Sequence, residues 1–326
     1  MIADKLMGNQ STSQAGQPNL KRIPSIPKLF FSAVFSAVAI FFLSGCGPQP
    51  GKPDLVWGKR GVLDGDLMRP RAIAIDNADR LFIVDFTARI QVYDLDGKYF
   101  GPTWTTPDFR KGRPSGLGID RHGNLIVCDS HYHCIRFYSA DGKELRSIGG
   151  DTHGFSYISD VVQDADGFLY VSEFSEYDRI TKMTEDGEIV ARWGKLGGEP
   201  GNFNRARALA LGPDGNLYVA DACNHRIQVL TRNGEFVRSF GKPGSGLGEL
   251  QYPYDLAFGP KGHLYVVERS NGRIQKFSML GESLGTWGAP GRQPGQFSDP
   301  WALAVDRKGR VHVVDTENHR VQRIDW

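Results

Sequence analysis

The chain has 326 residues, including 40 glycines and 18 prolines, which is enough for one large domain or two modest ones with many turns. Its formal net charge is +2 at pH 7, and residues 1–45, with four basic residues against one acid, contribute +3, so the remainder carries −1. A nearly neutral body offers no electrostatic attraction to a phosphate backbone, and we expect no nucleic-acid partner.

The first 45 residues have the composition of a targeting segment. Residues 1–20 are polar and without apolar periodicity, and we expect them to be disordered. A basic stretch, residues 21–28, precedes an uncharged apolar run of 15 residues, 29–43. That run is shorter than a membrane-spanning helix requires and is typical of the core of a signal peptide.

The apolar run ends in the sequence LSGC, which resembles the lipobox of bacterial lipoproteins. The resemblance implies that residues 1–45 are removed and that Cys46 becomes the first mature residue, with a diacylglycerol on its sulfur. Residues 46–53 are then a short tether, and the protein is expected on a membrane of the cell envelope, at the outer membrane or the periplasmic face. The alternative interpretation is an uncleaved signal anchor with an incidental cysteine.

The rest of the chain is one unit repeated six times. In each unit an apolar run of the LYVAD type ends in an acid, and these acids follow one another at spacings of 44, 44, 48, 47 and 47 residues. The recurring acids are Asp85, Asp129, Glu173, Asp221, Glu268 and Asp315. Each unit predicts four short β-strands joined by Asp-Gly, Asn-Gly or Lys-Gly turns. Strands on a period of roughly 40–50 residues indicate the blades of a β-propeller.

The two ends of the repeat region predict how the ring closes. The chain ends in a third strand, residues 319–326, whereas residues 54–58 precede the first unit and have the pattern of a fourth strand. We therefore predict an all-β, six-bladed propeller over residues 54–326, with four strands in each blade and with 54–58 completing the sixth blade. Closing the ring in this way removes open strand edges, and we expect a monomer.

Residues 215–241, GNLYVADACNHRIQVLTRNGEFVRSFG, resemble an NHL repeat. Residues 291–305 contain the glycine, aromatic and proline residues of the segment that leads into each repeat of that family, here called the lead-in. The lead-ins of the second and third blades, residues 106–116 and 151–160, lack parts of this pattern. The resemblance implies the NHL-type propeller fold, but it implies little about activity because propellers host many unrelated functions.

The stretch DACNHR, Asp221 to Arg226, contains the residue types of a metal site or a Cys–His nucleophile pair. Comparison with the other units favours a structural role, because the acid recurs in all six blades and an arginine in five: Arg89, Arg179, Arg226, Arg273 and Arg320. We expect the acid to accept backbone N–H bonds, Asn224 to adopt a left-handed turn conformation and the arginine to pair with acids or carbonyls. We predict no catalytic residue.

The second blade is unusual in its cysteines and histidines. Cys128 and Cys134 lie on adjacent predicted strands, and an oxidising compartment leaves a cross-strand disulfide or two free thiols as alternatives. His131 and His133 lie between them, but a metal site there would need ligands from elsewhere. We predict no metal ion and no other cofactor.

Candidate binding residues are those at which the repeats differ. In propellers the first strand of each blade lines the central channel, and the residue just before it lies at the channel mouth. These mouth positions are Arg71, Ser115, Ser159, Arg207, Tyr254 and Trp301. One position later come Ala72, Gly116, Asp160, Ala208, Asp255 and Ala302.

The mouth positions include two arginines from opposite blades, Arg71 and Arg207. Together with the aromatic residues at two other mouth positions, Tyr254 and Trp301, they are predicted to clamp an anionic or aromatic group, such as a carboxylate, a phosphate or a peptide terminus. Asp160 and Asp255 are candidates for holding a cation or an amine. In the alternative arrangement, the arginines are solvated at the rim or paired with these two acids.

These observations favour a lipid-anchored binding or scaffolding module that presents its channel mouth to a protein, a peptide or a small anionic ligand. The alternative is a metal-dependent propeller enzyme. A resemblance to the peptidyl-hydroxyglycine lyase implies histidine ligands, and the mouth positions hold none. A resemblance to gluconolactonase implies Glu, Asn and Asp ligands in the channel, where only Asp160 and Asp255 are available.

Overall fold

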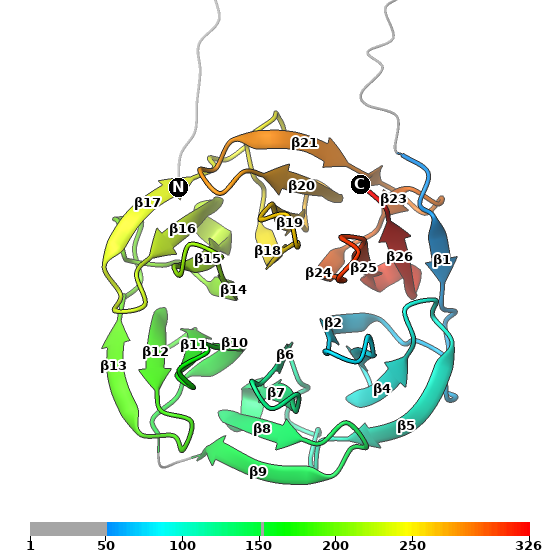
Figure 1. Cartoon of the computed structure of the whole chain (residues 1–326), viewed down its shortest axis with the longest axis horizontal. Coiled ribbons are helices and arrows are strands. Elements are labelled where there is room, and N and C mark those ends of the chain that lie inside the picture. The colour runs from blue at the N-terminus through cyan, green and yellow to red at the C-terminus, as the bar shows by residue number, and fades with distance from the viewer. Residues whose placement is uncertain (1–50, 151–152) are drawn as a thin grey trace, which may run out of the picture. The chain divides into compact units, whose positions relative to one another are not determined.

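The computed structural model describes residues 51–150 and 153–326, which form six four-stranded antiparallel sheets arranged in a ring (Figure 1). This confirms the predicted all-β, six-bladed propeller. The strands nearest the channel are β2 (Pro70–Ile75), β6 (Gly116–Ile119), β10 (Tyr157–Gln163), β14 (Ala206–Leu211), β18 (Pro253–Phe258) and β24 (Pro300–Val305). The second strands are β3 (Leu81–Asp85), β7 (Leu125–Asp129), β11 (Leu169–Phe174), β15 (Leu217–Asp221), β19 (Leu264–Glu268) and β25 (Val311–Asp315).

Two further strands complete each blade towards the rim. The third strands are β4 (Arg89–Tyr93), β8 (Cys134–Tyr138), β12 (Arg179–Met183), β16 (Arg226–Leu230), β20 (Arg273–Phe277) and β26 (Arg320–Ile324). The outer strands are β5 (Tyr99–Thr105), β9 (Glu144–Gly149), β13 (Ile189–Trp193), β17 (Phe236–Phe240), β21 (Ser283–Trp287) and β1 (Leu55–Trp57). Blades are numbered 1 to 6 in the order of their innermost strands.

The predicted ring closure is confirmed, because β1 pairs antiparallel with β26 and forms the outer strand of blade 6. Figure 1 shows β1 in blue beside β26 in red. Arg323 reinforces this seam, since its guanidinium donates to the Asp54 carboxylate at 2.7 Å and to the Leu95 carbonyl of blade 1 at 2.8 Å. Main-chain and side-chain hydrogen bonds therefore join the two ends of the repeat region.

Each junction between neighbouring blades contains an apolar cluster in the described part of the chain. At the junction of blades 4 and 5, Tyr218 and Val229 pack with Leu264 and Val266, and all four side chains are fully buried. The second strands are covered on both faces by the adjacent blades, which is why their sequences are nearly continuous apolar runs, as in LYVAD of β15. The ring is thus stabilised mainly between its sheets.

The recurring acid is fully buried in all six blades. In blade 4, Asp221 accepts the backbone N–H of Asn204 in the lead-in at 2.7 Å and the Nε–H of Arg226 at 2.8 Å. It also accepts the side-chain amides of Asn224 at 2.9 Å and Gln228 at 3.0 Å. The acid therefore connects the lead-in, the turn and the third strand of its own blade, as a structural residue would.

The recurring arginine extends this network, as predicted. Arg226 donates to the Asn202 carbonyl of the lead-in at 3.0 Å in addition to its contact with the acid. Blade 2 has Cys134 at the position of this arginine, and there Arg136 donates to Asp129 at 2.8 Å instead. A residue two positions further along the strand thus provides the same ion pair.

The prediction that Asn224 adopts the left-handed conformation is wrong. Asn224 ends a single 3₁₀ turn, η3 (Ala222–Asn224), and the residue in the left-handed region is His225, with a φ of +56°. Histidine is enriched among non-glycine residues in this region, and its side chain has a second role here. Its Nδ1 accepts the backbone N–H of Tyr252 from blade 5 at 3.2 Å. The histidine therefore connects one blade to the next.

The lead-ins are of two kinds. In blades 1, 4, 5 and 6 each lead-in closes on itself through a parallel bridge that ends in an apolar residue, at most 1% exposed. The bridges are Arg60–Leu67, Leu196–Phe203, Pro243–Leu250 and the pair β22 (Ala289–Pro290) with β23 (Gln296–Phe297). Among the described residues, blades 2 and 3 have no such bridge, in agreement with their incomplete sequence pattern.

Cys128 and Cys134 are free thiols. In the pairing of β7 with β8, Cys128 lies opposite Ile135 and Cys134 lies opposite Asp129. Directly opposed residues share a face of the sheet and successive residues alternate faces, so the two sulfur atoms lie on opposite faces. The strand register therefore excludes the disulfide.

The predictions for the signal segment and for Cys46 lie outside the described residues. Within the described ranges the helices are the 3₁₀ turns η1 (Ser130–Tyr132), η3 and η4 (Thr316–Asn318). None of these has the length and apolar character needed to cross a bilayer.

Replacing Asp221 with alanine is expected to lower the free energy of unfolding by about 3–5 kcal/mol, because Arg226 and the Asn204 N–H would remain buried without their carboxylate. Urea denaturation followed by tryptophan fluorescence measures the change. Asp186→Ala, at an exposed turn, is the control and should alter the value by less than about 0.5 kcal/mol. Equal stability of the two variants would contradict the structural role of the buried acid.

Candidate functional site

The innermost strands surround a cavity of about 230 Å³, here called the channel cavity. Small side chains leave this space open, since Ala72, Ala208 and Ala302 line it together with Gly116. Gly116 also permits close approach of the next blade, because a Cβ at this position would lie 2.5 Å from the Ser159 carbonyl oxygen. The inner surface of the ring is therefore accessible to a small group.

All six mouth positions predicted from the sequence line the channel cavity: Arg71, Ser115, Ser159, Arg207, Tyr254 and Trp301. All of them except Ser159 also line a second cavity of about 270 Å³, here called the vestibule. The mouth positions thus form the boundary between the two cavities. The structure brings them together, but five of the six lie within the innermost strands, at irregularities of the strand register, and only Ser115 precedes its strand as predicted. Their role in binding stays a prediction.

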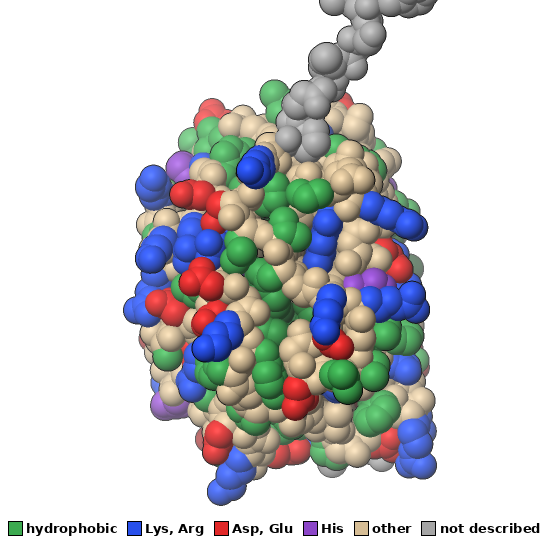
Figure 2. Space-filling model, turned by 90° about the vertical axis from the view of Figure 1, so that its right-hand side faces the viewer, with side chains coloured by type: hydrophobic (Ala, Val, Ile, Leu, Met, Phe, Trp, Pro, Cys, Tyr) green, Lys and Arg blue, Asp and Glu red, His purple; other side chains and the backbone are tan. Residues whose placement is uncertain are grey.

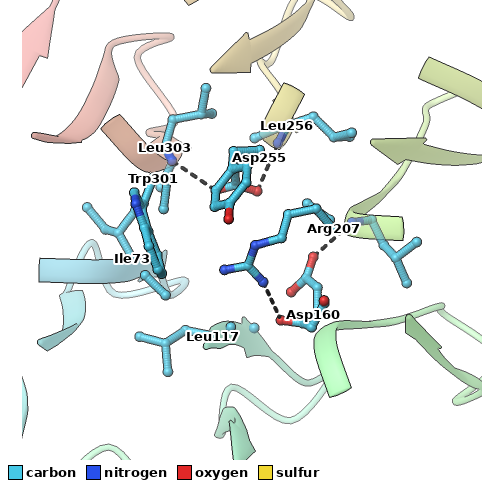
Figure 3. Close-up of a pocket in the computed structure, with 18 of the residues that line it drawn as sticks. Ile73, Leu117, Asp160, Arg207, Asp255, Leu256, Trp301 and Leu303 are labelled. Carbon is cyan, nitrogen blue, oxygen red and sulfur yellow. Dashed lines mark hydrogen bonds between the residues drawn. The ribbon is translucent and has the colours of Figure 1, made fainter. Parts of the chain in front are cut away.

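Arg207 is only 7% exposed, and its guanidinium lies over two aromatic rings. Its Cζ is 4.9 Å from the Tyr254 ring centroid and 5.6 Å from that of Trp301. It donates to two backbone carbonyl oxygens, each at a long distance of 3.4 Å. Figure 3 shows this guanidinium projecting into the cavity toward Trp301. Five N–H donors are available on an arginine, so Arg207 retains capacity to bind a ligand.

Arg71 approaches the same indole, with its Cζ 4.6 Å from the Trp301 ring centroid. Its Nε is buried and has no acceptor among the described residues. Burial and the neighbouring charge of Arg207 lower the pKa of Arg71 to about 10, so the cation persists at neutral pH but is less favourable than in water. In the described ranges neither arginine forms an ion pair with Asp160 or Asp255, which was one form of the alternative arrangement, although the charge of Arg207 acts on both carboxyl groups.

Asp160 and Asp255 line the channel cavity but not the vestibule. Asp160 accepts the backbone N–H of Leu209 in blade 4 at 2.8 Å, and Asp255 accepts that of Leu303 in blade 6 at 2.9 Å (Figure 3). Each carboxylate therefore connects its own innermost strand to that of the next blade. This structural role was not predicted, and it occupies oxygen atoms that a bound cation or amine would need.

The same two carboxyl groups are held in an environment that favours their neutral form. Burial raises the pKa of Asp160 to about 6, and burial together with the charge of Asp160 raises the pKa of Asp255 to about 8. Both carboxyl groups therefore keep their protons to higher pH than an exposed aspartate would. The cavity leaves part of each side chain accessible, so this titration changes the charge next to the mouth arginines.

The vestibule adds six residues that sequence comparison did not predict as site residues: Arg113, Ser130, His131, Tyr157, Phe174 and Arg205. Arg113 and Tyr157 belong to the lead-ins of blades 2 and 3, which lack the closing bridge. In the sequence, the incomplete repeat pattern of these two lead-ins indicated that they differ from the others. Which of their residues reach the mouth could be seen only in the structure.

Arginines around the vestibule are neutralised by acids. Arg69 pairs with Glu317 and Arg269 with Asp299, and these four residues line a separate cavity of about 120 Å³. On the side of the ring, basic and acidic side chains are interspersed (Figure 2). The vestibule differs, because none of its four arginines forms an ion pair with a carboxylate of the described residues. Its arginines are therefore not engaged in direct ion pairs, although Asp160 and Asp255 lie near Arg207 and Asp178 lies near Arg205.

The DACNHR stretch carries no reactive arrangement. Asp221 and His225 are used in contacts within and between blades, and burial raises the pKa of the Cys223 thiol. Over residues 51–150 and 153–326, no three His, Cys, Asp or Glu side chains are grouped so that they could hold a metal ion.

Several solved structures are similar to this chain. One, described as a streptogramin B lyase, is 16% identical with a TM-score of 0.60, and the match covers 81% of this chain and 94% of that one. A gluconolactonase from Xanthomonas campestris is 15% identical with a TM-score of 0.60, over 79% and 86% of the two chains. A protein of unknown function from Bacteroides thetaiotaomicron is 16% identical with a TM-score of 0.63, over 84% and 76%. At these identities the likeness concerns the fold alone.

The NHL repeat family model matches residues 203–230, 250–277 and 297–324. Each match begins at the buried apolar residue that closes a lead-in and ends in the third strand of a blade. Each therefore includes the acid and arginine network described above. The matched segments belong to blades 4, 5 and 6, which have closed lead-ins. The chain thus contains NHL repeats, and it is a six-bladed β-propeller.

Proposed function

We propose that the protein is a binding module whose channel mouth receives an anionic group of a peptide, a partner protein or a small molecule. The observation that carries this proposal is the convergence of Arg71 and Arg207 on Trp301 without a carboxylate partner in the described ranges. Burial removes water from these cations, and their like charges repel. An anion between them would accept their free donors, including the buried Nε–H of Arg71.

The mouth is built to hold its aromatic rings in place. Arg269 donates to the Tyr254 hydroxyl at 3.2 Å, and the Trp301 indole N–H donates to Asp299 at 3.0 Å. A planar guanidinium can stack on an aromatic ring and still bind a carboxylate or phosphate through two parallel hydrogen bonds. Because the rings are already positioned, binding would require little further ordering of side chains.

We further propose that the module is anchored in the cell envelope through a lipid on Cys46, which rests on the sequence. A tether of the eight residues 46–53 spans at most about 28 Å. It would keep the ring close to the membrane.

Arg71→Met is expected to weaken sulfate binding by about tenfold to a hundredfold, since a charge-assisted hydrogen bond contributes roughly 1.5–3 kcal/mol. Methionine retains an unbranched apolar stem that can still contact Trp301. Isothermal titration calorimetry of the full chain in detergent, with sodium sulfate at constant ionic strength, measures the change.

Arg292→Met is the matched control, because Arg292 is exposed and lines neither cavity. It should leave sulfate affinity unchanged. If the Arg71 variant also binds sulfate as tightly as the wild-type protein, the mouth is not the anion site.

Sulfate binding should weaken as the pH rises, because ionisation of Asp160 and Asp255 adds negative charge beside the mouth arginines. Their pKa values of about 6 and about 8 set the range in which this occurs. Since both values lie above the unfolded value of about 4, the folded state binds more protons, and the free energy of unfolding also falls as the pH rises through this range. Sulfate titrations and urea denaturation at several pH values measure the two effects.

Asp255→Asn removes this titration, because the amide cannot ionise, and its oxygen can still accept one of the two backbone N–H groups, those of Leu256 and Leu303, that the carboxylate accepts. The variant should show a smaller loss of sulfate affinity and of stability above neutral pH. A pH dependence as steep as that of the wild-type protein would assign the effect to other groups.

A further inference from the structure

The vestibule combines positive charge with aromatic surface, and this combination indicates the class of the ligand. We propose that the ligand is a small aromatic anion, an inference that rests on the proposed anion site. Its charged end would lie between Arg71 and Arg207, and its ring would lie in the vestibule against Tyr157 and Phe174.

The distribution of charge gives the ligand a direction. The vestibule is lined by four arginines, His131 and four aromatic residues, and no Asp or Glu side chain lines it. On the other side of the mouth, the channel cavity contains Asp160 and Asp255. An anion held at the mouth is therefore favoured to extend into the vestibule, whose lining contains no carboxylate.

Three rings that line the vestibule pack against one another. The Tyr157 ring lies 5.1 Å from His131 and 5.7 Å from Phe174, measured between centroids, and His133, outside the vestibule, supports it at 5.4 Å. The Arg205 guanidinium covers Phe174 at 5.1 Å. These spacings are those of interacting aromatic pairs, and a further flat ring could join the series.

The remaining vestibule arginine is held in a defined position. Arg113 donates from Nε to the Phe86 carbonyl at 2.6 Å, and its guanidinium lies 4.4 Å from the Phe86 ring centroid. Arg113 and Arg205 thus continue the positive charge away from the mouth. Guanidinium groups attract the faces of aromatic rings as well as anions, so both parts of the proposed ligand would be favoured here.

The size of the vestibule is consistent with one ring. An apolar cavity of about 150 Å³ is large enough to hold benzene, and the vestibule has about 270 Å³. It therefore has room for a benzene-sized ring, while the charged substituent occupies the mouth shared with the channel cavity.

Three probes separate the ring from the charge: benzoate, cyclohexanecarboxylate and sulfate. We expect the full chain in detergent at pH 7 to bind benzoate about three- to tenfold more tightly than cyclohexanecarboxylate, measured by calorimetry. The saturated ring is at least as apolar, so hydrophobicity alone would not produce this order. Tyr157→Leu and Phe174→Leu should each reduce the preference and leave sulfate affinity unchanged.

Phe236→Leu, at an exposed aromatic residue of the outer strand β17, is the control and should retain the preference. Equal affinity of the wild-type protein for the two carboxylates, with sulfate still bound, would overturn the aromatic ligand class but not the anion site. Failure to bind sulfate and both carboxylates would overturn the proposed function itself. Retention of the preference in both leucine variants would contradict the placement of the ring. Should Tyr157→Leu not fold, Phe174→Leu and the wild-type comparison decide.

Discussion

A buried carboxylate near the end of the second strand holds the lead-in in place and so positions the mouth residues. In five blades this carboxylate accepts the backbone N–H of the residue three positions before the mouth residue: Met68, Ser156, Asn204, Gln251 and Ser298. In these blades the lead-in is thus held at a constant distance along the chain from the mouth position. A recurring acid therefore positions mouth side chains whose type varies between blades.

This division of roles explains how much the sequence could predict. The acids, the turns and the closing strand recur with a fixed period, so the blades and the mouth positions follow from local patterns seen several times. The left-handed residue was assigned wrongly, because the choice of His225 over Asn224 depends on the Tyr252 N–H of another blade. A pattern within one repeat does not contain that contact.

The vestibule and the channel carboxylates illustrate the same limit. Arg205 and Phe174 are far apart in the repeat pattern and meet only because blades 3 and 4 are neighbours. Asp160 looked like a ligand-binding acid because its equivalents in other blades are mostly small, yet it binds the Leu209 N–H of the following strand. Positions that differ between repeats are candidates for a binding role. Tertiary contacts decide which of these residues hold neighbouring blades together and which line the cavity.

The seam between β1 and β26 constrains the order of events during biosynthesis. Asp54 and Arg323, which bind each other there, are 269 residues apart, and the ribosome makes β1 first and β26 last. Blade 6 cannot be completed until translation has reached the last strand, and contacts of such long sequence separation form slowly. The ring therefore closes late, after the chain of all six blades has been made.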